Sequence, residues 1–274
     1  MKKILCIAIV CVFFCTGCVN NSKKENQIVV GLECNYAPFN WTQLDSKNGA
    51  VKIENGEGYC AGYDVEIAKL IAKDLGKELV IKKWTDFDAL PAAINTGDID
   101  LIIAGMSPSA ERKKVIAFSD PYYFSDLVLV VKKTSKYAGI TTLEGFSGAK
   151  VAAQIGTLHN DVIDQIKGVK HATPLSDFPT LTIAVKSGDI DAMISEKPVA
   201  LAIVANNPDL VLVDFTKGFS FTTEEEAGLS VSVGLKKGKD DLLKEINKTL
   251  ATLNDESRNT MMENAIKNQP QSEE

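Results

Sequence analysis

Histidine is scarce in this sequence: its 274 residues include only two, His159 and His171. Neither histidine lies in an HExxH pattern or at a spacing typical of Cys/His zinc sites. The chain also lacks a GxSxG nucleophile elbow and a Walker-type phosphate-binding loop. These absences argue against a zinc enzyme, a serine hydrolase and an NTPase. We therefore expect no bound metal, no cofactor and no catalytic residue.

Positive charge is in short supply as well. The chain has 30 lysine and arginine residues against 36 aspartate and glutamate residues, which gives a formal net charge of −6 at pH 7. No basic cluster interrupts this acidic excess. Because nucleic acids are recognised through basic patches, the balance argues against a nucleic-acid partner.

Long apolar runs are missing except near the N-terminus, where residues 4–15 are apolar and follow Lys2 and Lys3. This run is shorter than the roughly 20 residues that a membrane-spanning helix needs. Its length and its basic flank are typical of an export signal. The sequence therefore predicts a signal peptide over residues 1–17 and an exported protein.

The end of this signal contains a candidate lipidation site. Thr16 and Gly17 precede Cys18, and small residues before a cysteine resemble the bacterial lipobox, in which the cysteine is lipidated and becomes the mature N-terminus. Cys15 departs from that motif, which usually has leucine there. An ordinary cleaved signal with an incidental Cys18 is the alternative. The polar stretch 18–27 favours the lipoprotein, because it would tether a folded body to a membrane anchor.

Cysteine is rare in the body of the chain. Four of the six cysteines lie at or before position 18, so only Cys34 and Cys60 remain in the expected mature protein. An even pair in an exported protein suggests a disulfide. Two unpaired thiols are the alternative.

What the sequence does contain is a near repeat. Residues 93–104 read AINTGDIDLIIA and residues 184–195 read AVKSGDIDAMIS, and the two share Ala, Gly, Asp, Ile, Asp and Ile position by position. Each copy reads as a helix end, a glycine C-cap and an apolar strand that runs into polar residues. Ligands of open α/β sheets bind beyond the carboxyl ends of strands. We therefore expect two similar lobes that offer strand ends to one cleft; chance recurrence of a common pattern is the alternative.

The rest of the body alternates strands with helices, which is typical of α/β lobes. Besides the second repeat strand, the pattern predicts strands at 27–33, 78–84, 101–104, 126–133, 150–154, 210–213 and 229–236. It predicts helices at 63–75, 87–95, 109–115, 158–166, 178–186, 198–206, 240–253 and 257–267. Residues 41–59 are polar and rich in glycine, so we expect an exposed loop or hairpin tip there.

The strongest candidate site is the stretch AGMSPSAER at 104–112. We expect Ser107 to cap a short helix that has Pro108 at its first position. Free N–H groups at a helix start attract an anion, and Arg112 is close enough in sequence to turn its guanidinium to the same place. A guanidinium beside such amides fits a carboxylate. A plain helix cap with a solvated arginine is the alternative.

A similar turn is expected in the other half of the chain, at QIGTLH, residues 154–159. Gly156 and Thr157 lie between a predicted strand and a predicted helix, where they offer N–H groups and a hydroxyl. An ordinary strand-to-helix turn explains them as well. His159 reads as a surface residue of the helix.

A positively charged ligand group also has candidate partners. Glu196 directly follows the second repeat strand and could hold an ammonium group, or it could pair with Lys197 at the surface. Tyr36 and Phe87 could face a ligand with their rings, although isolated aromatic residues usually belong to a core. Glu33 ends the first strand, and a buried carboxylate there needs a partner. An anion clamp, a cation acceptor and aromatic walls together fit a free amino acid.

Several short motifs, taken in order, resemble one known family. They are YAPF at 36–39, GYDV at 62–65, Phe87 followed by LPAAINTGDID, AGMSPSAER, FSDPYY at 118–123, QIGT at 154–157 and GDIDAMISE. The set resembles the family 3 solute-binding proteins, the receptors of polar amino-acid ABC importers, over nearly all of residues 28–267. The resemblance implies an α/β, type II periplasmic-binding-protein fold. In that fold each of two lobes is a mixed sheet flanked by helices, and the ligand cleft lies between the lobes.

The resemblance also implies roles for individual residues. The positions matching those that bind the ligand's α-carboxylate are Arg112, Ser107, Thr157 and Leu158, the last two through their amides. The positions matching those that bind the α-ammonium are Gly105, through its carbonyl, and Glu196. The positions matching those around the ligand's side chain are Tyr36, Phe87, Glu33 and Gln154.

This chain departs from the family pattern in ways that bear on selectivity. Glu196 stands where aspartate is more frequent, and Leu158 replaces a frequent threonine, so it offers only its amide. His159 lies where related chains vary, and we assign it no role. Residues 41–58 are an insertion that could cover the cleft rim. Because Glu33 would face the ligand's side chain, arginine or lysine is the favoured ligand, with glutamine as the alternative.

The family plan predicts one lobe from residues 28–123 with 223–270, and a second lobe from 124–222. It implies an ABC permease and its ATPase as partners, a monomeric receptor, and a lipid anchor on the outer face of the bacterial cytoplasmic membrane. Two other functions stay open: a dehydratase-like enzyme on the same scaffold that acts on a small carboxylic acid, and a ligand sensor.

Overall fold

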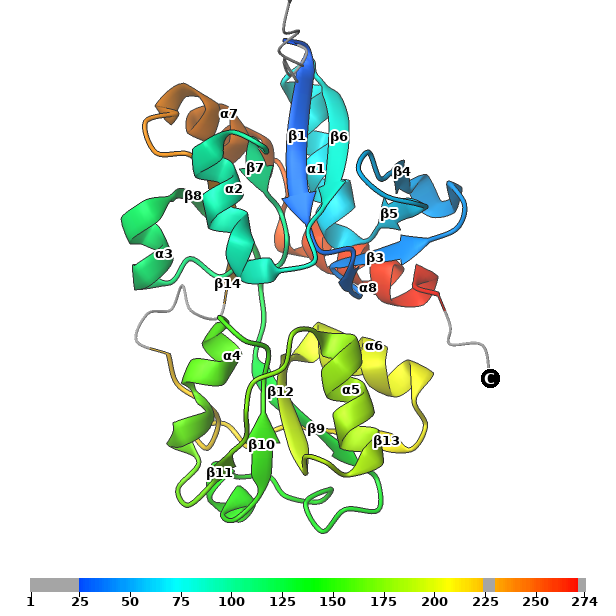
Figure 1. Ribbon diagram of the computed structural model, residues 1–274, viewed down its shortest axis with the longest axis vertical. Helices are drawn as coiled ribbons and strands as arrows, with labels where there is room; N and C mark the ends of the chain where they lie inside the picture. Colours follow the sequence, from blue (N-terminus) through cyan, green and yellow to red (C-terminus); the bar gives the residue numbers. More distant parts are fainter. Residues whose placement is uncertain (1–24, 224–229, 271–274) are drawn as a thin grey trace, which may run out of the picture.

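The computed structural model describes residues 25–223 and 230–270 as a two-lobed α/β protein, with one lobe above the other in Figure 1. The expected signal peptide, Cys18 and most of the tether lie outside the described residues. Within the described ranges, no helix is long and apolar enough to cross a bilayer. The same ranges contain no group of three or more His, Cys, Asp or Glu side chains placed to hold a metal ion.

The first lobe is built on a mixed five-stranded sheet with the order β6-β1-β7-β14-β8. Its strands are β1 (Gln27–Leu32), β6 (Glu78–Lys83), β7 (Leu101–Ile102), β8 (Ala117–Phe124) and β14 (Ser230–Leu235). β1 runs parallel to β6 and β7, whereas β14 runs antiparallel to β7 and β8. The helices of this lobe are α1 (Tyr63–Asp74), α2 (Leu90–Thr96), α3 (Ala110–Val115), α7 (Asp240–Leu250) and α8 (Asp255–Asn268).

The second lobe repeats this plan with the order β11-β10-β12-β9-β13. Its strands are β9 (Leu127–Lys132), β10 (Lys150–Ala152), β11 (Lys170–His171), β12 (Ala192–Glu196) and β13 (Leu210–Val213). β10 runs parallel to β11 and β12, and β9 runs antiparallel to β12 and β13. The α-helices here are α4 (Leu158–Asp161), α5 (Phe178–Ser187) and α6 (Lys197–Asn206). The predicted mixed sheet in each lobe is therefore present.

The near repeat in the sequence occupies equivalent places in the two sheets. β7 lies between a parallel and an antiparallel neighbour, and so does β12. The helix before each strand ends at a glycine with a positive φ, Gly97 at +86° and Gly188 at +88°. Glycine adopts this left-handed conformation without the steric penalty of a side chain. The shared glycine is therefore the shared helix stop.

The second aspartate of each repeat ties the turn to the neighbouring parallel strand. The Asp100 carboxylate accepts a hydrogen bond from the Val29 backbone N–H at 2.9 Å, and Asp191 accepts one from the Lys150 N–H at 2.8 Å. Both donors belong to the parallel neighbour, β1 in one lobe and β10 in the other. The repeat therefore encodes a helix stop, a turn and a bond that holds two parallel strands in register.

The chain leaves the first sheet at the end of β8, Phe124, and enters the second sheet at the start of β9, Leu127. It returns from β13 to β14. The carboxyl end of β1 points toward the second lobe (Figure 1). The side chains that follow the strand ends of both sheets are therefore brought toward the space between the lobes.

The expectation of a loop or hairpin tip over residues 41–59 is wrong in part. This segment contributes to a small antiparallel sheet with the order β2-β3-β5-β4. Its strands are β2 (Asn35–Tyr36), β3 (Asn40–Gln43), β4 (Val51–Lys52) and β5 (Tyr59–Ala61), with the short 3-10 helix η1 (Lys47–Gly49) between β3 and β4. Trp41 and Ile53 are buried in the core of the first lobe. Each strand carries too few apolar residues to show a period, so the sequence pattern did not reveal the sheet.

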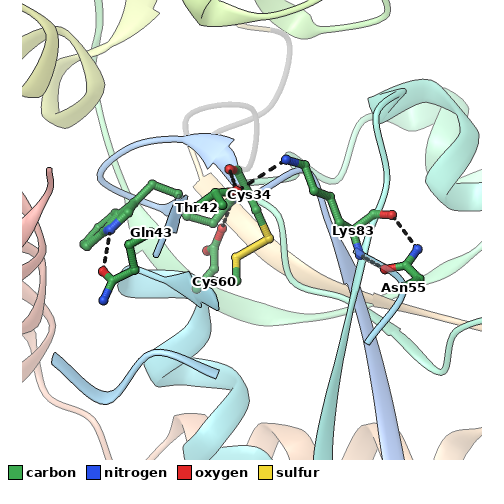
Figure 2. The surroundings of a disulfide bond; sticks show 9 residues. Cys34, Thr42, Gln43, Asn55, Cys60 and Lys83 are labelled. Atoms are coloured by element: carbon green, nitrogen blue, oxygen red, sulfur yellow. Dashed lines mark hydrogen bonds between the residues drawn. A yellow bond between two sulfur atoms is a disulfide. The ribbon is translucent and has the colours of Figure 1, made fainter. Parts of the chain in front are cut away.

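A disulfide joins Cys34 to Cys60, with the two Cα atoms 5.7 Å apart (Figure 2). The Thr42 hydroxyl donates to the Cys34 carbonyl at 2.8 Å, and the Lys83 ammonium donates to the Thr42 hydroxyl at 3.3 Å. On chain-entropy grounds a loop of this length stabilises the fold by about 3.5 kcal/mol. Because Cys34 directly follows Glu33, the bond also anchors the end of β1.

Two predicted helices are divided in the structure. The helix expected at 87–95 consists of the 3-10 turn η2 (Phe87–Ala89) and α2, and the one expected at 158–166 consists of α4 and the 3-10 turn η4 (Ile163–Gln165). A further 3-10 turn, η3 (Leu143–Phe146), precedes β10. Hydrophobic periodicity does not separate α from 3-10 turns this short, because both bury the same few side chains.

Candidate ligand-binding site

Polar groups follow the strand ends of both lobes. Glu33 comes directly after β1, and Gly105 lies shortly after β7 in the first lobe. Gln154 lies shortly after β10 in the second lobe, and Glu196 is the last residue of β12. These are the positions at which open α/β sheets bind ligands. The two residues from the first lobe therefore face the two residues from the second lobe across the space between the lobes.

All ten residues predicted from the sequence to contact a ligand line one cavity between the lobes. Its lining consists of Glu33, Tyr36, Phe87, Gly105, Ser107, Arg112, Gln154, Thr157, Leu158, His159 and Glu196. The cavity volume is about 10 Å³, which is the scale of a single water molecule. An amino acid can therefore enter only if the lobes, or these side chains, move apart.

Arg112 bridges the two lobes. Its guanidinium donates to the Ser107 carbonyl at 2.9 Å and, across the cleft, to the Gly156 carbonyl at 2.8 Å. It also lies over the Phe87 ring, 4.9 Å from the centroid, which is a favourable cation–π distance. Burial lowers the pKa of Arg112 to about 10, and the negative charges of Asp88 and Asp161 act against that shift. The guanidinium therefore stays charged at neutral pH.

The expected role of Ser107 as a helix cap is wrong. α3 begins at Ala110, and its cap is Ser109, whose hydroxyl accepts from the Arg112 N–H at 3.3 Å. Ser107 instead lies in the turn before the helix, where its carbonyl holds the Arg112 guanidinium. Pro108 is consequently outside the helix as well. Ser107 and Ser109 carry the same capping signal, and only the backbone geometry selects between them.

Glu196 lies at the centre of a buried polar cluster. It accepts a hydrogen bond from the Tyr36 hydroxyl of the opposite lobe, and its carboxylate lies 3.0 Å from Nε2 of His159. Each of the three residues is less than 7 % exposed. Burial acts to raise the pKa of Glu196, but the His159 pair and the Tyr36 hydrogen bond outweigh it and hold this pKa below its usual value. Glu196 is therefore an anion at neutral pH.

His159 is the site residue that sequence reasoning missed. It is buried, its ring meets the Phe178 ring edge-on at 5.8 Å, and its Nδ1 atom has no hydrogen-bond partner among the described residues. Because a carboxylate carries no proton, the Nε2 atom that faces Glu196 must be the N–H donor. The one signal available in the sequence is its place two residues after Thr157, at the first turn of a helix that follows a strand end.

Glu33 forms a third contact between the lobes. Its carboxyl group accepts a hydrogen bond from the Gln154 side-chain amide at 2.9 Å, and the same amide donates to the Ser176 carbonyl at 3.0 Å. Burial raises the pKa of Glu33 to about 8; the Gln154 bond acts against this shift, and the charges of Asp177, Asp86 and Asp88 add to it. At neutral pH most of this carboxyl group is protonated, since no cation among the described residues pairs with it.

Aromatic rings complete the cavity. The Tyr36 ring stacks on Phe39 at 5.4 Å within its own lobe and meets Phe178 of the second lobe at 4.7 Å.

Thr157 precedes α4, and its hydroxyl donates to the Gln154 carbonyl at 2.7 Å. The site therefore combines a guanidinium, a buried carboxylate, a protonatable carboxyl group and flat apolar walls, which together suit a small zwitterion.

The sequence pattern of the bacterial extracellular solute-binding proteins, family 3, matches residues 28–265. The chain belongs to this family. The match spans both lobes and all the cavity residues described above. The two-lobed architecture and the position of the cavity are thus features of a family 3 solute-binding protein.

Individual relatives of this family 3 protein agree with the assignment. The chain is 32% identical to the L-cystine-binding protein TcyJ of Escherichia coli over 86% of this chain and 81% of the relative. It is 31% identical to the arginine-binding extracellular protein ArtP of Bacillus subtilis, over 93% and 94%. Among solved structures, it resembles the amino acid ABC transporter substrate-binding protein AbpA of Streptococcus pneumoniae bound to L-arginine. That likeness has a TM-score of 0.73 at 31% identity and covers 88% of this chain and 95% of the other.

Proposed function

We propose that this protein is the substrate-binding receptor of an amino-acid ABC importer and closes its two lobes on one free polar or basic L-amino acid. The observation that carries the proposal is a buried interlobe cavity lined by the Arg112 guanidinium and the Glu196 carboxylate. Opposite charges in one small cavity match the opposite charges of an amino acid. The relatives named for cystine and arginine support the same ligand class.

In this proposal Arg112 binds the ligand's α-carboxylate. A guanidinium has five N–H donors, and the Ser107 and Gly156 carbonyls engage two of its nitrogens. The remaining donors are available for a carboxylate, assisted by Ser107 and by the amides of Thr157 and Leu158. Because the carbonyls that hold Arg112 come from both lobes, binding the carboxylate and closing the lobes are coupled.

Glu196 and the Gly105 carbonyl bind the α-ammonium group in the same proposal. The support is the low pKa of Glu196, which keeps this carboxylate charged despite its burial. The Tyr36 hydroxyl and His159 hold the carboxylate in place. Charge-assisted hydrogen bonds contribute about 1.5–3 kcal/mol each. Several of them support micromolar affinity, about −8 kcal/mol, after the cost of ordering the ligand.

The ligand's side chain lies between Tyr36 and Phe87 and ends near Glu33 and Gln154. A guanidinium or ammonium group there would pair with the Glu33 carboxyl group and favour its ionised form, so arginine or lysine leads. A glutamine amide could bond the protonated Glu33 and the Gln154 amide instead, so glutamine is the second choice. The arginine-binding relatives support a basic ligand over glutamine.

The same proposal covers the lobe boundaries, the membrane anchor, the oligomeric state and the partners of the receptor. We infer that residues 28–123 with 223–270 form one lobe and 124–222 the other. The receptor is lipidated at Cys18, held on the outer face of the bacterial cytoplasmic membrane, monomeric, and served by a permease and its ATPase. It releases its amino acid chemically unchanged, since its family consists of binding proteins rather than enzymes.

A thermal-shift panel of the twenty amino acids tests the ligand class, and native mass spectrometry of freshly purified protein tests for a retained ligand. We expect arginine or lysine to raise the melting temperature most. A response to glutamine with none to either basic amino acid would refute the basic preference. No response to any amino acid would refute the receptor proposal. Conversion of the bound amino acid, detected by mass spectrometry after incubation, would refute the non-enzymatic role.

A further inference from the structure

Two sequence motifs, GYDV and FSDPYY, lie behind the cavity and supply none of its lining residues. Asp64 comes from GYDV at the start of α1, and Tyr122 comes from FSDPYY in β8. Both side chains are fully buried. The Tyr122 hydroxyl donates to the Asp64 carboxylate at 2.7 Å and accepts from the Gly105 backbone N–H at 3.1 Å. A chain of two hydrogen bonds therefore runs from Asp64 to a backbone atom of the cavity wall.

Asp64 is itself held firmly. Its second carboxylate oxygen accepts from the Asn40 side-chain amide at 2.8 Å, and its backbone N–H donates to the Phe39 carbonyl at 2.8 Å. No cation among the described residues pairs with this carboxylate, and burial raises its pKa to about 7. Burying an unpaired carboxyl group is costly for the fold. Packing alone would be served better by an apolar side chain.

Gly105, at the end of this series of hydrogen bonds, is constrained both by its conformation and by its contacts. Gly105 has a φ of +60°, and a Cβ added to it would lie 2.7 Å from the Tyr36 ring. The Met106 carbonyl, one residue later, accepts from the Ser232 N–H at 3.0 Å. The peptide group before the one that contains the Gly105 carbonyl is thus held through the Gly105 N–H, and the peptide group after it is held through the Met106 carbonyl. The Tyr122 bond fixes the side nearer to β7, where the Gly105 N–H also interacts with the Asp64 carboxylate.

From this geometry we infer that Asp64 and Tyr122 are positioning residues of the ligand site. Asp64 orients the Tyr122 hydroxyl, and the hydroxyl holds the Gly105 turn so that its carbonyl faces the ligand's ammonium group and its bare Cα leaves room for the Tyr36 ring. The inference rests on the proposed function for its ligand. It extends that function to two residues outside the cavity.

The test compares two buried tyrosines, of which only Tyr122 has a hydroxyl that bonds the Gly105 N–H. Tyr122→Phe removes the hydroxyl that holds Gly105. Tyr63→Phe is the matched control, because the Tyr63 hydroxyl is equally buried and donates only to the Tyr122 carbonyl, at 2.9 Å. We expect both variants to melt at lower temperature than the wild type. By titration calorimetry with the amino acid that stabilises the wild type most, we expect affinity to fall at least tenfold in Tyr122→Phe and less than threefold in Tyr63→Phe.

Equal losses of affinity in the two variants, or wild-type affinity in Tyr122→Phe, would overturn the inference.

A second measurement needs neither a variant nor a ligand. Amide hydrogen exchange of the wild type by NMR should show the Gly105 N–H protected at least a hundredfold relative to exposed loop amides. Exchange of Gly105 at the rate of an exposed loop would overturn the inference even if no amino acid bound, so its failure is distinguishable from failure of the receptor proposal.

Discussion

At the scale of single residues, Arg112 does two things at once. Its guanidinium joins the lobes through the Ser107 and Gly156 carbonyls, and it keeps donors for a ligand. Lysine at this position would supply a charge but not the planar set of donors. The same side chain therefore links lobe closure to recognition of a carboxylate.

Replacement of this residue gives the first prediction. Arg112→Ala leaves the ligand's carboxylate buried without a partner, which costs about 3–5 kcal/mol. At 1.4 kcal/mol per tenfold, the affinity should fall at least about a hundredfold. Titration calorimetry with the best ligand measures the loss, and circular dichroism checks that the variant is folded. A loss of less than about fivefold would remove Arg112 from the binding site.

Glu33 gives a prediction about pH. Its pKa is about 8 in the folded protein against an ordinary 4.5, so the folded state holds a proton that the unfolded chain releases. The stability from this group is complete below about pH 4.5 and is lost as pH rises toward about 8. Glu33→Gln cannot titrate. Relative to the wild type, it should therefore gain stability between pH 5 and pH 8, on the order of a few kcal/mol.

Urea unfolding of ligand-free protein at the two pH values measures this difference. Asp64, whose pKa is also raised, to about 7, titrates in both proteins and so cancels in the comparison. Identical pH slopes for Glu33→Gln and the wild type would show that Glu33 is not the buried, protonated group described here.

His159 and Ser107 show what could not be predicted at this scale. The identities of the residues that line the cavity follow from strand ends and from the order of family motifs, and these signals are local. The burial of His159 against Glu196 depends on how α4 packs over the end of β12, and no local pattern reports that. The choice of Ser109 over Ser107 as a cap depends on where the backbone of residues 107–109 turns.

At the scale of elements, the repeated GDID turn is the clearest link between sequence and structure. Its helix stop and its strand were predictable, because a glycine C-cap and an apolar run are both local signals. The bonds of Asp100 and Asp191 to the neighbouring strand were not, because they depend on the parallel pairing. The small sheet formed by β2 to β5 was missed for a related reason: its strands are only two to four residues long, too short to show hydrophobic alternation, and their pairing is not a local signal.

The two aspartates provide a matched pair for a stability prediction. Each removal leaves a strand N–H without its charged acceptor, which costs about 1–3 kcal/mol where the bond is buried. Asp100 is half-buried and Asp191 is exposed, so water can replace the second bond more readily. Urea denaturation should show that Asp100→Ala lowers the free energy of unfolding more than Asp191→Ala does. The reverse order would contradict the account of this turn.

At the scale of the whole molecule, several contacts hold the lobes together. Besides the Arg112 bond to Gly156, the Gln154 amide reaches Glu33, and the Tyr36 hydroxyl reaches Glu196. At the far end of the interface the Gln269 side chain, just after α8, donates to the Ala202 carbonyl of α6 at 3.2 Å. The contacts within the cavity involve the same groups that we assign to the ligand. Opening of the lobes therefore exposes the ligand-binding groups together.

The two-lobed arrangement was predictable from the order of the motifs, whereas the closeness of the lobes was not. Lobe contacts such as Gln154 with Glu33 join residues 121 positions apart, and no periodicity encodes such a pair. The exact lobe boundaries stay a prediction.

The most direct test of the account is a crystal structure of the protein with the amino acid that raises its melting temperature most. The account predicts one ligand molecule between the lobes, its carboxylate within hydrogen-bond distance of the Arg112 guanidinium and its ammonium group on Glu196 and the Gly105 carbonyl. A ligand bound elsewhere, or one in the cleft whose charged ends avoid both side chains, would contradict it.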